Sequence, residues 1–107
     1  MKRIIFTLLY NSGQFVLSRN FRTQNIGDIN WILKNYNLSE ITKGIDEILI
    51  LDITRKNKNP EKFSEVVKLI SSNCFIPLSV GGGISSVYQA EKLFKSGADK
   101  IFLNKLF

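Results

Sequence analysis

The stretch LSVGGGISSVYQAEKLFKSGADKIFLNK, residues 78–105, carries a full strand–helix–strand pattern. An apolar run, 75–80, ends at three consecutive glycines, 81–83. Ser85 can cap a helix after the glycines, and a second apolar run, 100–103, then predicts another strand. The apolar face of the predicted helix consists of Val87, Ala90, Leu93 and Phe94. The bare glycine backbone therefore lies where a strand turns into a helix.

Two earlier apolar runs repeat this alternation. RIIFTLL, 3–9, and EILILDI, 47–53, are short and free of polar alternation, so each predicts a buried strand. One helix is expected from Asp28, with Ile29, Ile32, Leu33 and Tyr36 at helical spacing, and it or its extension ends near Gly44. Another helix is expected from Pro60, and its apolar face consists of Phe63, Val66, Val67 and Ile70. The predicted order is β-α-β-α-β-α-β, which indicates a parallel sheet covered by helices.

The fold class follows from this order and from the length of 107 residues. A turn at 11–13 and an alternating piece at 15–17 predict a β-hairpin after the first strand. Doubly wound and barrel architectures both fit an α/β chain of this pattern. Because a (β/α)8 TIM barrel takes about 250 residues, a barrel sequence of this length would be close to half of one, as a single domain.

Composition narrows the function classes. The chain has no histidine and one cysteine, Cys74, which predicts a packed thiol, no internal disulfide, no metal site and no cofactor. No apolar run is long enough to span a membrane, and the amino terminus is interpreted as a strand of a cytoplasmic protein. The net charge is +6, with a basic cluster at 55–62. Stacking aromatics are not interleaved with these charges, so nucleic acid is not expected; the cluster either attracts an anion or solvates a loop.

Polar or glycine residues gather where the predicted strands end, which is the active face in both architectures. The glycine loop and the following helix start form a possible phosphate site; a tight turn is the alternative explanation. The glycine loop consists of Gly81, Gly82 and Gly83, and the polar pair Asn104 and Lys105 follows the next predicted strand at the same face. These five residues are the candidates for phosphate or substrate binding, which for Asn104 is what a family resemblance implies. Asp52 ends its strand, where it can orient substrate, act as a catalytic base, or bond its own loop.

The motifs GIDEILILDIT (44–54), IPLSVGGGI (76–84) and GADKIFLN (97–104), with KRII (2–5), resemble the cyclase subunit family of imidazole glycerol phosphate synthase. The resemblance implies a ribulose-phosphate-binding (β/α)8 barrel, of which this chain matches the amino-terminal half. It places Gly82 and Asn104 in a phosphate site and Asp52 in the substrate pocket.

The resemblance also implies a glutaminase partner at the amino-terminal face of the barrel. Ammonia would pass through the barrel to a phosphorylated ribosyl substrate on the opposite face. Arg3, Glu47 and Lys100 would form the charged ring at the ammonia entrance, and Asp99 would face the glutaminase. From the residues alone, the first three lie near strand starts and can pair; ordinary surface ion pairing is the alternative.

The chain departs from the family pattern at the end of the first strand. The catalytic aspartate of the cyclase falls at Leu9, and the lysine of the next loop falls at Leu17. Lys105 replaces a threonine beside the phosphate-site asparagine. Such a leucine is found in cyclase-like proteins associated with glycosyl amidation, which FTLLYNSGQFVLSRNFRTQNIGD (6–28) resembles more closely. That subfamily implies ammonia delivery to a sugar amidotransferase in lipopolysaccharide O-antigen biosynthesis.

Three hypotheses follow. The first is an ammonia-channelling barrel subunit of the sugar-amidating kind, with a phosphorylated or nucleotide-linked small substrate. The alternative is the cyclase of histidine biosynthesis, a lyase with an altered first strand. The third is a non-catalytic half-barrel that binds phosphate or a partner, and a four-stranded half is expected to self-associate because its sheet edges and barrel-lining surface are exposed.

Overall fold

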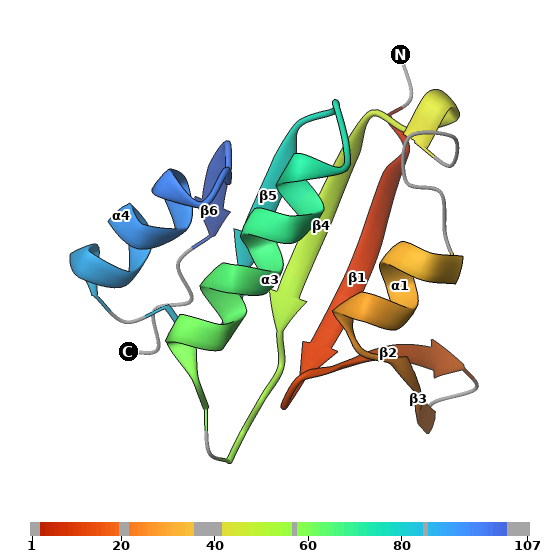
Figure 1. Cartoon of the computed structure of the whole chain (residues 1–107), viewed down its shortest axis with the longest axis horizontal. Helices are drawn as coiled ribbons and strands as arrows, with labels where there is room; N and C mark the ends of the chain where they lie inside the picture. The colour runs from red at the N-terminus through yellow and green to blue at the C-terminus, as the bar shows by residue number, and fades with distance from the viewer. Residues whose placement is uncertain (1–2, 20–21, 36–41, 57, 85, 103–107) are drawn as a thin grey trace.

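The computed structural model describes residues 3–19, 22–35, 42–56, 58–84 and 86–102. They form one mixed six-stranded sheet with helices packed on it (Figure 1). The strands are β1 (Ile5–Asn11), β2 (Gln14–Arg19), β3 (Arg22–Gly27), β4 (Glu47–Asp52), β5 (Leu78–Gly81) and β6 (Lys100–Phe102). The helices are α1 (Ile29–Asn35), the 3-10 turn η1 (Thr42–Gly44), α3 (Pro60–Ser72) and α4 (Val87–Lys95).

The strand order is β3-β2-β1-β4-β5-β6, and the four strands from β1 to β6 run parallel. α3 connects β4 to β5, and α4 connects β5 to β6 (Figure 1). This confirms the predicted α/β class, because neighbouring parallel strands need crossover helices between them. The described sheet has the arrangement of part of a TIM barrel.

All three α-helices contribute to one core on one face of the sheet. Alternate side chains of β1, β4 and β5 point into this core and meet α3 along its length. The fully buried side chains include Phe15, Ile32, Ile48, Ile50, Val67, Ile70, Leu78 and Val80. The apolar helix residues Phe63, Val66, Val67 and Ile70 that the spacing predicted are all buried, so the 3.6-residue period located the core face of α3 correctly.

The hairpin after the first strand is larger than the sequence predicted. β2 pairs antiparallel with the carboxyl end of β1, and β3 adds a second antiparallel strand up to Gly27. Ser12 and Gly13 form the turn with positive φ values of 51° and 91°. The alternation at 15–17 marked only part of β2, because β3 has no apolar period of its own.

The predicted starts of β5 and α4 were wrong. β5 starts at Leu78 rather than residue 75, since the proline at 77 has no amide hydrogen for a ladder. Ser86, not Ser85, caps α4, and its hydroxyl accepts a bond from the Gln89 amide at 3.1 Å. α1 is described as far as Asn35, and the 3-10 turn η1 ends at Gly44, where the helix or its extension was predicted to end. Residues 36–41, which include the predicted helix residue Tyr36, and the predicted cap Ser85 lie outside the described residues.

The other face of the sheet, which would line a barrel, has no helices among the described residues. Its row of side chains includes Ile5, Leu9, Leu49, Leu51 and Phe102. Ile5 and Phe102 are 48% and 55% exposed. The sheet ends at β6 on one side, and on the other side β2 and β3 extend it beyond β1. An apolar sheet face is unstable in water unless another surface covers it.

We therefore expect the isolated polypeptide 1–107 to self-associate, because association covers this face. Sedimentation velocity over a range of concentrations measures it directly. A variant carrying Ile5→Lys and Phe102→Lys has charges on the exposed face, and the fraction of monomer should be higher for this variant than for the wild type. A monodisperse, cooperatively unfolding wild-type monomer would contradict the prediction.

Candidate functional site

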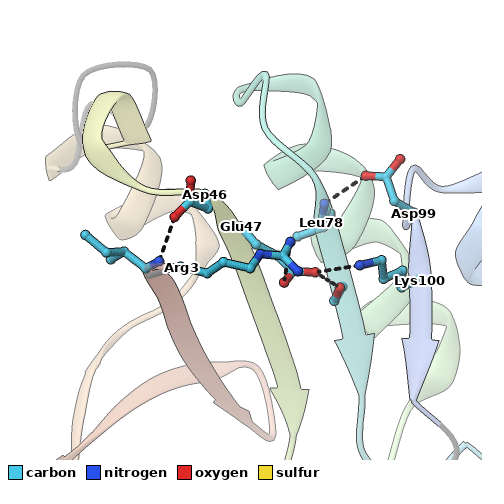
Figure 2. A network of polar contacts seen from close by, with 8 residues as sticks. Arg3, Asp46, Glu47, Leu78, Asp99 and Lys100 are labelled. Carbon is cyan, nitrogen blue, oxygen red and sulfur yellow. Dashed lines mark hydrogen bonds and ion pairs between the residues drawn. The ribbon is translucent and has the colours of Figure 1, made fainter. Parts of the chain in front are cut away.

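A buried carboxylate organises the amino end of the sheet. Glu47, the first residue of β4, is 5% exposed and accepts a hydrogen bond from the Ser79 hydroxyl on β5. Arg3 and Lys100 each place a nitrogen 3.9 Å from one of its two carboxylate oxygens (Figure 2). We call Arg3, Glu47, Ser79 and Lys100 the base cluster.

In the base cluster, Glu47 and Ser79 are buried and bonded to each other, whereas Arg3 and Lys100 are half exposed. The Ser79 side chain is fully buried and holds the Glu47 carboxylate in place. The side chains of Arg3 and Lys100 are 58% and 55% exposed, and 3.9 Å is longer than a hydrogen bond. Both cations can therefore move away without breaking a bonded network, while Glu47 stays oriented. Sequence analysis had grouped Arg3, Glu47 and Lys100 but had missed Ser79. The signal for it was a polar serine inside an apolar strand that neighbours the strand beginning at Glu47.

Two aspartates join neighbouring strands at the same end of the sheet. The Asp46 carboxylate accepts the Ile4 amide at 2.7 Å, and the Asp46 amide donates to the Ile4 carbonyl at 2.8 Å. Asp99 makes the same pair of bonds with Leu78, at 2.8 and 2.7 Å (Figure 2). Asp99 was predicted to face a partner; its carboxylate here bonds the start of β5, and the partner role stays a prediction.

Cys74 lies just behind this end of the sheet and is buried. Burial raises the pKa of its thiol; a backbone hydrogen bond with Ile76 opposes the shift, and the charge of Asp99 adds to it. A neutral thiol packed in the core confirms the prediction from sequence that Cys74 is a core residue.

At the opposite end, the three glycines turn β5 toward α4 directly against β4. Gly82 has φ +99°, and a Cβ on it would lie 2.2 Å from the Asp52 carbonyl oxygen. Gly83 has φ +66°, and a Cβ there would lie 1.8 Å from the Lys58 amino group. At Gly82 the Asp52 backbone and the positive φ both require glycine, independently of any ligand. At Gly83 the positive φ favours glycine, whereas the flexible Lys58 side chain could move aside.

Lys58 lies over this glycine loop, and sequence reasoning had left it unassigned within the basic cluster 55–62. Its amino group donates to the Gly82 carbonyl at 3.1 Å and lies 3.8 Å from the Asp52 carboxylate. One cation of the cluster is therefore held at the end of β5, where the resemblance implies a phosphate. The sequence did not indicate this contact of Lys58, because any lysine of the loop could equally have pointed into solvent.

Asp52 is buried, and its carboxylate is bonded to the loop that follows β4. The Thr54 amide donates to its carboxylate at 3.0 Å, and Lys58 pairs with the other oxygen. Asp52 follows Ile48 and Ile50 in the row that faces the helices, so its carboxylate lies on the outer side of the sheet. Of the alternatives left open by the sequence, the loop-bonding role is the one observed; a catalytic role stays a prediction.

The barrel-facing row ends in different residues. Leu9 and Leu51 are cross-strand partners, and Leu51 is paired in turn with Gly81. Among the described residues, this end of the row holds no ionisable side chain between β1 and β5. The predicted ligands Asn104 and Lys105 lie outside the described residues, and the side chain of Leu17 in β2 is not described.

In the part of the chain that the structure describes, no helix is long and apolar enough to cross a membrane.

Comparison with known proteins gives a family match over nearly the whole chain. The sequence profile described as histidine biosynthesis protein matches residues 3–106. A protein of Parasynechococcus marenigrum (strain WH8102), provisionally named imidazole glycerol phosphate synthase subunit hisF2, is 50% identical over 103 residues, which are 96% of this chain and 38% of that protein.

Two further relatives carry the name imidazole glycerol phosphate synthase subunit HisF. The protein from Thermococcus onnurineus (strain NA1) is 38% identical and the one from Bacillus cereus (strain AH187) is 42% identical, each over 104 residues. In both cases the match covers 96% of this chain and 40% of the relative. The chain thus spans about two fifths of the length of these relatives.

The packing of the glycine loop predicts a sharp difference between two alanine substitutions. Gly82→Ala should destabilise the full-length protein by roughly 3 kcal/mol or more, because a strained φ and a backbone clash combine. Gly44→Ala is the matched control, since a Cβ there meets nothing within 4 Å. Urea unfolding of both variants measures the difference. Equal midpoints would mean that the loop does not pack on β4 as described.

Proposed function

The chain belongs to the histidine biosynthesis protein family, and on that premise we propose that it is the amino-terminal part of a barrel subunit of the imidazole glycerol phosphate synthase type. In this proposal the subunit takes ammonia from a glutaminase at the amino end of its strands. The ammonia then reacts with a phosphorylated ligand held at the carboxyl end. The names of the relatives support the histidine-pathway cyclase better than the sugar-amidating alternative.

The observation that carries this proposal is the base cluster. A single carboxylate, Glu47, lies buried at the strand starts with a cation on either side. In this proposal the side chains of the base cluster close the base of the barrel to bulk water and leave a polar route for ammonia. Because Arg3 and Lys100 are half exposed and not hydrogen-bonded to Glu47, they are suited to move when a partner binds.

The phosphate of the ligand is assigned to the other end of β5. Gly82 and Gly83 present backbone there, and Lys58 supplies a positive charge beside them. A phosphate would compete with Asp52 for Lys58, and it offers the ammonium three oxygens instead of one distant carboxylate. Asn104 and Lys105 complete this site in the proposal.

Leu9 favours a second candidate function. A hydrocarbon side chain cannot transfer a proton, and its neighbour across the ladder, Leu51, cannot either. A subunit with this pair can still conduct ammonia to an acceptor elsewhere. The acceptor would then be a surface-polysaccharide sugar, modified by a separate sugar amidotransferase.

The glutaminase partnership is tested by an activity assay with the full-length protein. The candidate glutaminase should turn over glutamine faster when the protein is present than when it is absent. The double variant Arg3→Gln/Lys100→Gln should lose most of this stimulation, because the cations beside Glu47 are gone. Lys34→Gln/Lys68→Gln removes the same charge from exposed helix positions and should behave as wild type. Stimulation that is equal in both double variants, or absent throughout, would refute the proposed role of the base cluster.

The acceptor is tested by complementation of a cyclase-deficient strain. Under the histidine-pathway proposal, the full-length protein restores growth without histidine. Under the second candidate it fails, although it still stimulates the glutaminase. Leu9→Asp is then the informative variant, because it returns a carboxylate to the barrel-facing row and should allow at least weak growth if the rest of the site is that of a cyclase.

A further inference from the structure

A cavity lies at the carboxyl end of the sheet, apart from the glycine loop. It has a volume of about 370 Å³, and none of residues 81–83 lines it. The turn between β1 and β2, the loop after β4 and the first turn of α3 enclose it. Its lining residues are Tyr10, Ser12, Gly13, Thr54, Lys56, Asn59 and Lys62. Its size lies in the range of sites for small ligands.

This cavity opens on the outer side of the sheet. Tyr10 belongs to the same row as Leu8, which packs in the core beneath the helices. Leu9, the neighbour of Tyr10 in sequence, points to the barrel-facing side. A ligand in the cavity would therefore be separated by β1 and β4 from anything bound inside a barrel.

The cavity is positively charged. Lys56 and Lys62 line it, and no acidic residue does so among the residues that the structure describes. Neither lysine has an ion-pair partner in the described ranges, whereas Lys58 and Lys92 are paired with Asp52 and Glu61. Two unpaired cations in one concave site attract an anion.

The backbone adds to this charge. Asn59 caps α3, a helix of 13 residues, so the positive end of its dipole adjoins the cavity. The Lys62 amino group lies 3.1 Å from the position that a Cβ on Gly13 would take. Glycine at this turn, with φ +91°, thus leaves room for the lysine to reach across from α3 to the hairpin.

Tyr10 supplies a neutral hydrogen-bond donor at the base of the cavity. It is 3% exposed, with its ring against Phe15 and Phe63 at centroid distances of 5.7 and 5.1 Å. Burial raises the pKa of its phenol, the charge of Asp52 raises it further, and a backbone bond with Gly13 opposes them. The hydroxyl therefore keeps its proton at neutral pH and does not repel an anion.

We propose that this cavity binds a phosphate group, as inorganic phosphate or as a phosphate monoester, between Lys56 and Lys62 with Tyr10 beneath it. Two ammonium groups, a phenol and a helix start match the charge and the several acceptor oxygens of a phosphate. The site is separate from the phosphate position of the proposed function and does not depend on it.

Inorganic phosphate is the probe for the test, with amide shifts of the isotope-labelled full-length protein followed by NMR. Phosphate should shift Gly13, Thr54 and Asn59 together and give one dissociation constant. Lys62→Gln and Lys56→Gln should each weaken that constant by roughly three- to tenfold, and Tyr10→Phe by a smaller factor. Lys68→Gln, on the exposed face of α3, removes the same charge and should leave it unchanged.

Lys58→Gln separates the two sites. If the cavity binds phosphate independently, its dissociation constant is the same in this variant, even where shifts at Gly82 and Gly83 are lost. Repeating the titration with glycerol phosphate distinguishes a monoester from free phosphate by which of the two binds more tightly. Shifts confined to the glycine loop, or equal weakening by Lys62→Gln and Lys68→Gln, would overturn the proposal.

Discussion

The burial of the Glu47 carboxylate is the constraint on which the amino end of this structure depends. A charge removed from water destabilises a fold unless hydrogen bonds and opposite charges surround it. Ser79 provides the hydrogen bond, and Arg3 and Lys100 provide the positive charge. These residues come from β5, from the segment before β1 and from β6, so all three must be in register with β4. The same requirement that fixes the sheet thus assembles the cluster to which ammonia entry is assigned.

The order of parallel strands and helices was predictable, because most apolar runs and periods mark a buried surface. The exception is α4, where Val87 and Phe94 of the predicted apolar face are 75% and 49% exposed. The family match over residues 3–106 confirms the resemblance seen in LDIT, VGGGI and GADK at the level of the family. β3 was missed because antiparallel edge strands need no apolar period. Ser86 replaced Ser85 as a cap because either serine satisfies the sequence rule and only the turn geometry decides.

The sequence predicted which residues lie near the candidate site better than it predicted which way their side chains point. Asp52 and Leu9 both lie where strands end, but the pleat sends Asp52 to the outer side and Leu9 to the barrel-facing side. No spacing rule for a single residue reveals that Lys58 lies over Gly83, because the contact joins two loops that are distant in sequence. Side-chain direction at strand ends and contacts between loops therefore needed the structure.

The bonds of Asp46 and Asp99 add to the backbone ladders of two neighbouring strand pairs, β1 with β4 and β5 with β6. Between the pairs, Ser79 bonds Glu47, and β5 extends from there to the glycine loop. Four residues of strand span roughly 13 Å. Because β5 is paired with β4 and with β6 along this length, the sheet holds the Glu47 carboxylate and the glycine loop at a fixed separation. The two ends of the sheet are therefore spaced by a continuous backbone ladder rather than by loops.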